Sequence, residues 1–104
     1  RTMAGVGKML KQAQKMQRQI ADAQAALAAR EIEVSSGGGA VIVKANGAGE
    51  MLSLKLDPEF LKESADVVGE TILSAVREAA AKAKALNEAE MRKATAGLSM
   101  PGLF

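Results

Sequence analysis

Four cationic side chains recur at helical spacing near the N-terminal end of the sequence, and they are Lys8, Lys11, Lys15 and Arg18. Steps of three and four residues place side chains on one face of an α-helix. The four would therefore form a row with about one cation for every 5 Å of helix axis. Such a row can meet successive phosphates of a polyanion and displace its condensed counterions. We call these four residues the basic stripe.

A merely solvated helix face is the alternative explanation of the basic stripe. Solvated faces usually mix charges of both signs, whereas Asp22 is the one acid within residues 1–30, which contain six cations. The stripe also occupies the N-terminal half of the helix, where the helix dipole disfavours positive charge. Helix stability therefore does not explain the stripe, and we expect it to bind phosphates.

The sequence offers few residue types or motifs for catalysis, metal binding or nucleotide binding. The sequence has no Cys and no His, which removes ordinary zinc and thiol sites and the usual nucleophile–base pairs. The Gly37–Gly39 run lacks the Gly-Lys-Ser/Thr of a phosphate-binding loop and fits a hairpin turn. With two Phe and no Trp or Tyr, the chain lacks the stacking platform that single-stranded nucleic acid uses. We expect no catalytic residue, metal, cofactor or small-molecule substrate.

A second, weaker group of cations lies late in the sequence. Arg92 and Lys93 follow Glu88 and Glu90 closely, so a salt-bridged surface helix is the favoured interpretation. Cations near a helix C-terminus also suit the helix dipole. Arg92 and Lys93 are therefore second-rank candidates for contact with DNA.

The helix that carries the basic stripe also has an apolar seam, roughly 145° around its axis from the stripe. The seam residues alternate in steps of three and four, and they are Val6, Met9, Ala13, Met16, Ile20, Ala23 and Leu27. This alternation is typical of a helix that packs against a partner. We predict a helix over about residues 3–30.

Three strands are predicted next, over residues 31–35, 40–45 and 50–56. Asn46-Gly47 between the last two is a strong hairpin signal. Leu52 and Leu54 alternate with polar residues on the third strand. The three strands are therefore expected to form an antiparallel meander.

A short helix and then a long helix complete the chain. Asp57-Pro58 is typical of an N-cap followed by the first helical residue, and we expect Phe60 and Leu61 to tuck under the sheet. Ser64 and Asp66 mark the start of the long helix, and Gly97 its end. The core positions of that helix are expected to be Val68, Ile72, Val76, Ala79, Ala83 and Leu86. The fold class is α+β.

One domain spans residues 1–104, with residues 1–5 and 98–104 expected to be flexible. A three-stranded meander leaves open edges, and long helices with seams leave apolar stripes. Both are covered if two chains associate, so we predict a homodimer. The candidate interface residues are Ile42, expected to be exposed, and Leu52, Leu54, Ile72 and Val76.

The pattern resembles the YbaB/EbfC family of nucleoid-associated proteins over essentially the whole chain. The matching motifs are Gly7–Gln17, Gly39–Gly47, Leu56–Pro58 and Pro101–Phe104. The resemblance implies a cytoplasmic, tweezer-like homodimer that binds duplex DNA in the nucleoid, with the basic stripe on the gripping helix. The chain departs from the family at Ile42, where a polar residue is common.

Two functions remain open. The first is binding of duplex DNA by a homodimer, with little or no sequence specificity. The second is a helical adaptor that binds another protein and not DNA, and the small residues Ala13, Ala23, Ala25 and Ala26 would let a partner helix approach closely. No grouping of nucleophile, base and pocket supports an enzyme.

Overall fold

The computed structural model describes residues 2–96, with side chains from residue 5 onward. The elements are α1 (Thr2–Ala29), β1 (Glu31–Ser36), β2 (Val41–Asn46), β3 (Met51–Leu56), the short 3-10 helix η1 (Phe60–Lys62) and α2 (Ala65–Ala96). The predicted α+β order is confirmed. The expected helix end at Gly97 and the expected flexible tail 98–104 lie outside the described residues.

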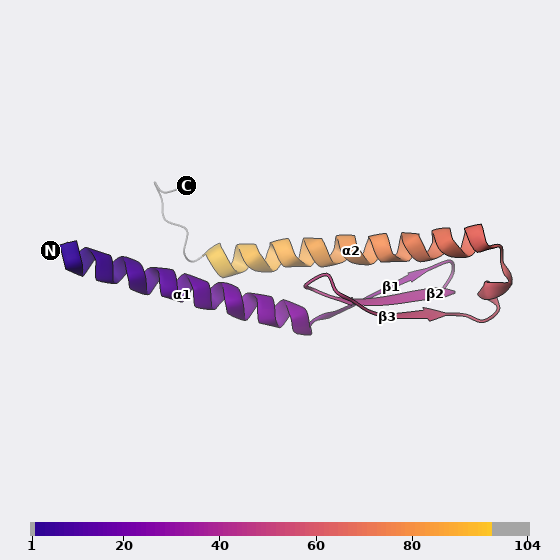
Figure 1. Cartoon of the computed structure of the whole chain (residues 1–104), viewed down its shortest axis with the longest axis horizontal. Helices are drawn as coiled ribbons and strands as arrows, with labels where there is room; N and C mark the ends of the chain where they lie inside the picture. The colour runs from indigo at the N-terminus through magenta and orange to yellow at the C-terminus, as the bar shows by residue number, and fades with distance from the viewer. Residues whose placement is uncertain (1, 97–104) are drawn as a thin grey trace.

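The protein is elongated because α1 and the sheet lie end to end along a single helix, α2 (Figure 1). Its principal extents are 74 × 23 × 16 Å and its radius of gyration is 20.5 Å. A compact domain of this length would have a radius of gyration of about 13 Å. α1 and α2 run in opposite directions, and the N-terminal turns of α1 extend past the end of α2 (Figure 1).

The sheet is the predicted antiparallel meander in the order β1-β2-β3. In the central strand β2, Val43 pairs with Val34 of β1 and with Leu54 of β3. Alternate side chains along β1 and β2 point towards α2. Val34, Val41, Val43 and Ala45 of the sheet form the core together with Ala75 and Ala79 of α2, and each of the six is at most 2% exposed.

The predicted Asn46-Gly47 hairpin is confirmed, and its first residue stabilises the turn through its side chain. Asn46 is 3% exposed, and its Oδ1 accepts the backbone N–H groups of Ala48 and Glu50, each at 3.0 Å. Its Nδ2 donates to the Glu50 carboxylate at 2.9 Å. All the polar atoms of this buried amide thus have partners, as burial requires.

Gly47 joins the hairpin to the end of α1. Its backbone N–H donates to the carbonyl oxygens of Leu27 at 2.9 Å and Arg30 at 3.0 Å. The first carbonyl group belongs to the last turn of α1, where a helix leaves acceptors available, and the second to the residue that follows α1. A Cβ atom at Gly47 would lie 2.7 Å from the Leu27 carbonyl oxygen and 2.9 Å from Leu27 Cδ2. Only glycine fits this contact, which fixes the direction of α1 relative to the sheet.

The segment after β3 is partly as expected. Asp57 Oδ1 accepts the Glu59 N–H at 3.1 Å, but the helix that follows is one 3-10 turn. Phe60 packs against the core as predicted, whereas Leu61 is 54% exposed, so its predicted burial was wrong. Consecutive side chains of a 3-10 helix point about 120° apart, so Phe60 and Leu61 do not face the same surface. Ser64 caps α2, because its Oγ accepts the Val67 N–H at 3.2 Å.

Gly47→Ala tests the contact between the hairpin and α1. We expect it to destabilise the protein by about 1–3 kcal/mol. The added methyl group would collide with the backbone carbonyl oxygen of Leu27, which cannot move aside as easily as the end of a flexible side chain. The matched control is Gly69→Ala in α2, where a Cβ meets nothing within 4 Å and the change should stabilise by up to about 1 kcal/mol. Urea unfolding at one protein concentration measures both. Equal effects of the two substitutions would refute the proposed tight contact.

Candidate nucleic-acid interface

All four residues of the basic stripe are exposed on α1. Within residues 2–96, the ion pairs involve only Arg30, Lys62 and Lys93 among the cations, so none of the stripe residues is paired with an acid. The stripe runs from Lys8 to Arg18, which is about 15 Å of helix axis. α1 therefore presents an uncompensated row of positive charge on a helix that projects from the rest of the molecule (Figure 1).

The apolar seam of α1 is covered over only half its length. From Met16 onward it packs towards α2, with Met16, Ile20 and Ala23 half-buried and Leu27 1% exposed. The N-terminal seam residues were expected to be buried as well, yet Val6 is 52% exposed and Met9 69% exposed. The reason is the offset between the two helices, since the described part of α2 ends before it reaches the first turns of α1 (Figure 1).

The second-rank cations lie near the other end of α1. Arg92 and Lys93 are exposed on the last turns of α2. Glu90 forms ion pairs with Lys93 at 3.6 Å and with Arg30 at 3.2 Å. Exposed pairs of this kind contribute roughly 0–1 kcal/mol to stability. Arg30 was not singled out from the sequence, because its position opposite Glu90 depends on how α1 lies along α2.

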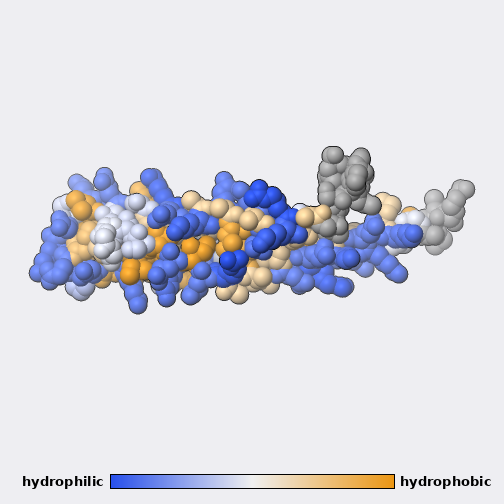
Figure 2. All heavy atoms as spheres, turned by 180° about the vertical axis from the view of Figure 1, so that it is seen from behind, coloured by the Kyte–Doolittle hydropathy of each residue, from blue (hydrophilic) through white to orange (hydrophobic). Residues whose placement is uncertain are grey.

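An apolar surface runs along β3 because α2 packs over β1 and β2. Met51, Leu52 and Leu54 are 42–49% exposed, and Leu73 of α2 is 46% exposed. We call these four residues the β3 strip. Leu73 and Ala80 are two helical turns apart on one flank of α2, and Ala80 faces the β2–β3 turn. Figure 2 shows hydrophobic residues reaching the surface over the half of the molecule that holds the sheet.

The structure separates the five residues expected in a dimer interface. Leu52 and Leu54 lie in the exposed β3 strip. Ile72 and Val76 are half-buried and pack against the core of the chain. Ile42 was expected to be exposed but is half-buried, because it lies on the central strand between Ser35 and Lys55. It belongs to the sheet face that points away from α2.

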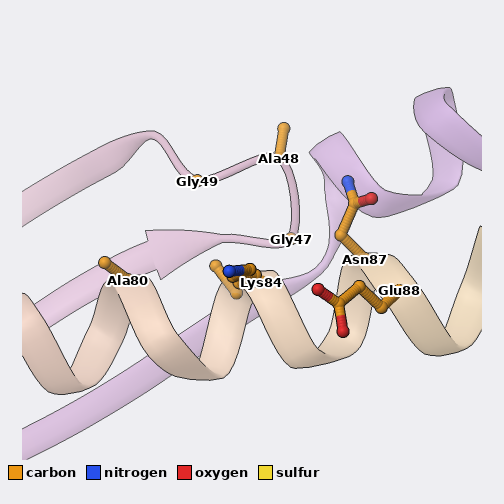
Figure 3. A pocket seen from close by; sticks show the side chains of 8 residues that line it. Gly47, Ala48, Gly49, Ala80, Lys84, Asn87 and Glu88 are labelled. Atoms are coloured by element: carbon orange, nitrogen blue, oxygen red, sulfur yellow. The ribbon is translucent and has the colours of Figure 1, made fainter.

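A shallow hollow of about 290 Å³ lies between the β2–β3 turn and α2 (Figure 3). Gly47, Ala48 and Gly49 form one wall, and Asn87 of α2 points towards them. Further hollows lie along the same side of α2, one at Leu73 and one at Met91. Small side chains, Asn87 and the charged residues Lys84 and Glu88 line the first hollow, and charged residues also line the other two.

Two other kinds of site are absent from the part of the chain that the structure describes. Within residues 2–96, no group of three acidic, His or Cys side chains could hold a metal ion. No helix in the same range is long and apolar enough to span a membrane.

Comparison with known proteins agrees with this arrangement. The model of the YbaB/EbfC DNA-binding family matches residues 3–98. A nucleoid-associated protein of Pelotomaculum thermopropionicum is 43% identical over 100 residues, covering 95% of each chain. One from Alkaliphilus metalliredigens is 42% identical over 97 residues, covering 92% of this chain and 85% of the other. The crystal structure of a Helicobacter pylori protein has the same fold, with a TM-score of 0.69, 24% identity, and coverage of 90% of this chain and 94% of that one.

Proposed function

The chain belongs to the YbaB/EbfC DNA-binding family, and from this premise we propose that it binds duplex DNA as a homodimer through phosphate contacts. The family is one of nucleoid-associated DNA-binding proteins and not a class of enzymes. The observation that carries the proposal is the basic stripe, which is exposed and unpaired with acids on a projecting helix.

Phosphate contact accounts for the composition of the stripe. Three of its four cations are lysines, which act as flexible point charges without the fixed geometry of base recognition. Their exposure lets each side chain follow the phosphate backbone, and every contact releases condensed counterions. Contacts to phosphate carry no direct sequence information, so we infer little or no sequence specificity.

Arg92 and Lys93 are proposed as additional contacts. Both are exposed on α2, and Lys93 shares Glu90 with Arg30. Because the ion pairs in this group are solvent-exposed, a phosphate can replace the carboxylate at small cost. We place the protein in the cytoplasm with the nucleoid, in keeping with the names of its relatives.

The large exposed surface of the chain supports the proposed homodimer. The accessible area of the chain is 7575 Å², whereas a compact monomer of 10.8 kDa exposes about 5,500 Å². The β3 strip adds an open strand edge beside apolar side chains, which is a surface that a second copy can cover. We propose that Leu52 and Leu54 lie at the centre of this interface. Ile72 and Val76 support it from the core, and Ile42 lies at its margin.

Charge reversal tests the DNA-binding face. We expect Lys11→Glu with Lys15→Glu to weaken binding to a labelled random duplex about tenfold or more, because four phosphate contacts per dimer are lost. The slope of log affinity against log salt should become shallower by about 3–4 units. Fluorescence anisotropy at several salt concentrations measures both quantities.

The matched control is Lys62→Glu with Lys82→Glu, which changes net charge equally at exposed positions outside α1. It should keep most of the affinity. Equal losses in the two double variants would mean that only total charge matters, and the stripe would not be the contact face. If the unmodified protein does not bind at low salt, the adaptor function gains support, and a stoichiometric protein partner should then survive nuclease treatment of a lysate.

A matched pair of substitutions in α2 tests the dimer. Leu73→Lys should raise the dimer dissociation constant at least about tenfold, equivalent to roughly 1.4 kcal/mol, because it buries an unpaired charge in the β3 strip. Val67→Lys lies on another flank of the same helix at nearly equal exposure, 44% against 46%. It should leave assembly unchanged. Sedimentation equilibrium reads both, and a monomeric unmodified protein at micromolar concentration would overturn the proposal.

A further inference from the structure

Three large apolar side chains stand on the first turns of α1 without cover from any described residue. Val6, Met9 and Leu10 are 52–69% exposed. Val6 and Met9 continue the seam that α2 covers from Met16 onward, while the cations of the basic stripe occupy a different face of the helix. Val6 and Met9 are therefore the uncovered continuation of an intramolecular contact, and Leu10 lies beside them, about 40° around the helix axis from Val6. We call these three residues the tip surface.

The chain itself continues from α2 in the direction of this tip surface. α2 is described to Ala96 and runs antiparallel to α1, so its C-terminal end points towards the N-terminal turns of α1 (Figure 1). Eight further residues follow, Gly97–Phe104, and half of them are large and apolar: Leu98, Met100, Leu103 and Phe104. These residues supply the apolar side chains that the tip surface requires.

The length of this segment matches the distance to be covered. From Met16 to Val6 is ten residues of helix, or about 15 Å. Eight residues in an extended conformation reach about 26 Å. Gly97, Pro101 and Gly102 disfavour a continued helix, and an extended segment can cover more of α1 than a helix of equal length.

We propose that residues 97–104 dock on Val6, Met9 and Leu10 of α1 in the same protomer. A tethered segment meets its site at an effective concentration near the millimolar range, which favours its own protomer over a second copy. The contact would complete the seam of α1 and hold the projecting turns that carry Lys8 and Lys11. That holding these turns influences the affinity for DNA rests on the proposed function, whereas the docking of residues 97–104 on α1 does not depend on DNA binding.

Engineered cysteines test the contact directly, since residues 1–104 contain none. Leu10→Cys with Leu103→Cys should form an intrachain disulfide under mild oxidation, because docking brings the two Cβ atoms within reach of a bond. The matched control is Lys11→Cys with Leu103→Cys, which has nearly the same tether length but places the thiol about 100° around α1. We expect the first pair to close at least about tenfold faster, as read by thiol titration and intact mass.

Two outcomes would overturn the proposal. The first is equal closure rates for the Leu10 and Lys11 pairs. The second is cross-linking between separate Leu10→Cys and Leu103→Cys chains that outpaces closure within one chain, which would assign the tip surface to a second copy. Neither measurement uses DNA, so failure here leaves the proposed DNA binding untouched.

Hydrogen exchange supplies an independent measurement that does not depend on a disulfide. A variant ending at Ala96 should exchange the amides of residues 5–13 about tenfold faster than the full chain, because the tip turns lose their cover. The amides of residues 16–27, which α2 protects, should exchange as before. Unchanged exchange over residues 5–13 would contradict docking of the segment.

Discussion

The close approach of α2 to the sheet is the contact on which the rest of the structure depends. Ala75 and Ala79 are fully buried, and their small side chains let the helix lie directly on the valines of β1 and β2. Ala83 is 2% exposed and lies beside the β2–β3 turn. Because one helix of 32 residues packs on the sheet with one half and on α1 with the other, the molecule is long and thin. Larger residues at these positions would push the helix off the sheet.

The small side chains of the core have a consequence for assembly. A core of alanine and valine buries little apolar area for each residue, and the chain exposes far more surface than a compact protein of its mass. The uncovered surfaces differ in character and in place. The basic stripe belongs to the projecting half of α1, whereas the β3 strip belongs to the opposite half of the molecule. In the proposed dimer, one half assembles the protein while the other meets DNA.

Local signals in the sequence predicted the elements well. Asn46-Gly47 marked the hairpin, Ser64 marked the start of α2, and the seam of α1 gave the length of its helix. The contact between Gly47 and Leu27 had no such signal, because the two residues belong to different elements. The ion pair of Arg30 with Glu90 was missed for the same reason. The exposure of Leu61 was missed because consecutive residues of a short helix point in different directions, and no local signal showed that Phe60 would face the core and Leu61 would not.

By itself, the sequence determined which side chains share a face: the cations of α1 lie on one side of the helix and its seam on another. Periodicity fixes these directions because they depend only on the axis of the element that carries them. The tertiary structure alone decided which faces are covered. α2 covers the seam from Met16 onward and leaves Met9 exposed, and it lies over β2 while Leu54 of β3 stays bare. Coverage depends on the lengths and offsets of elements distant in the chain, and no local spacing encodes these.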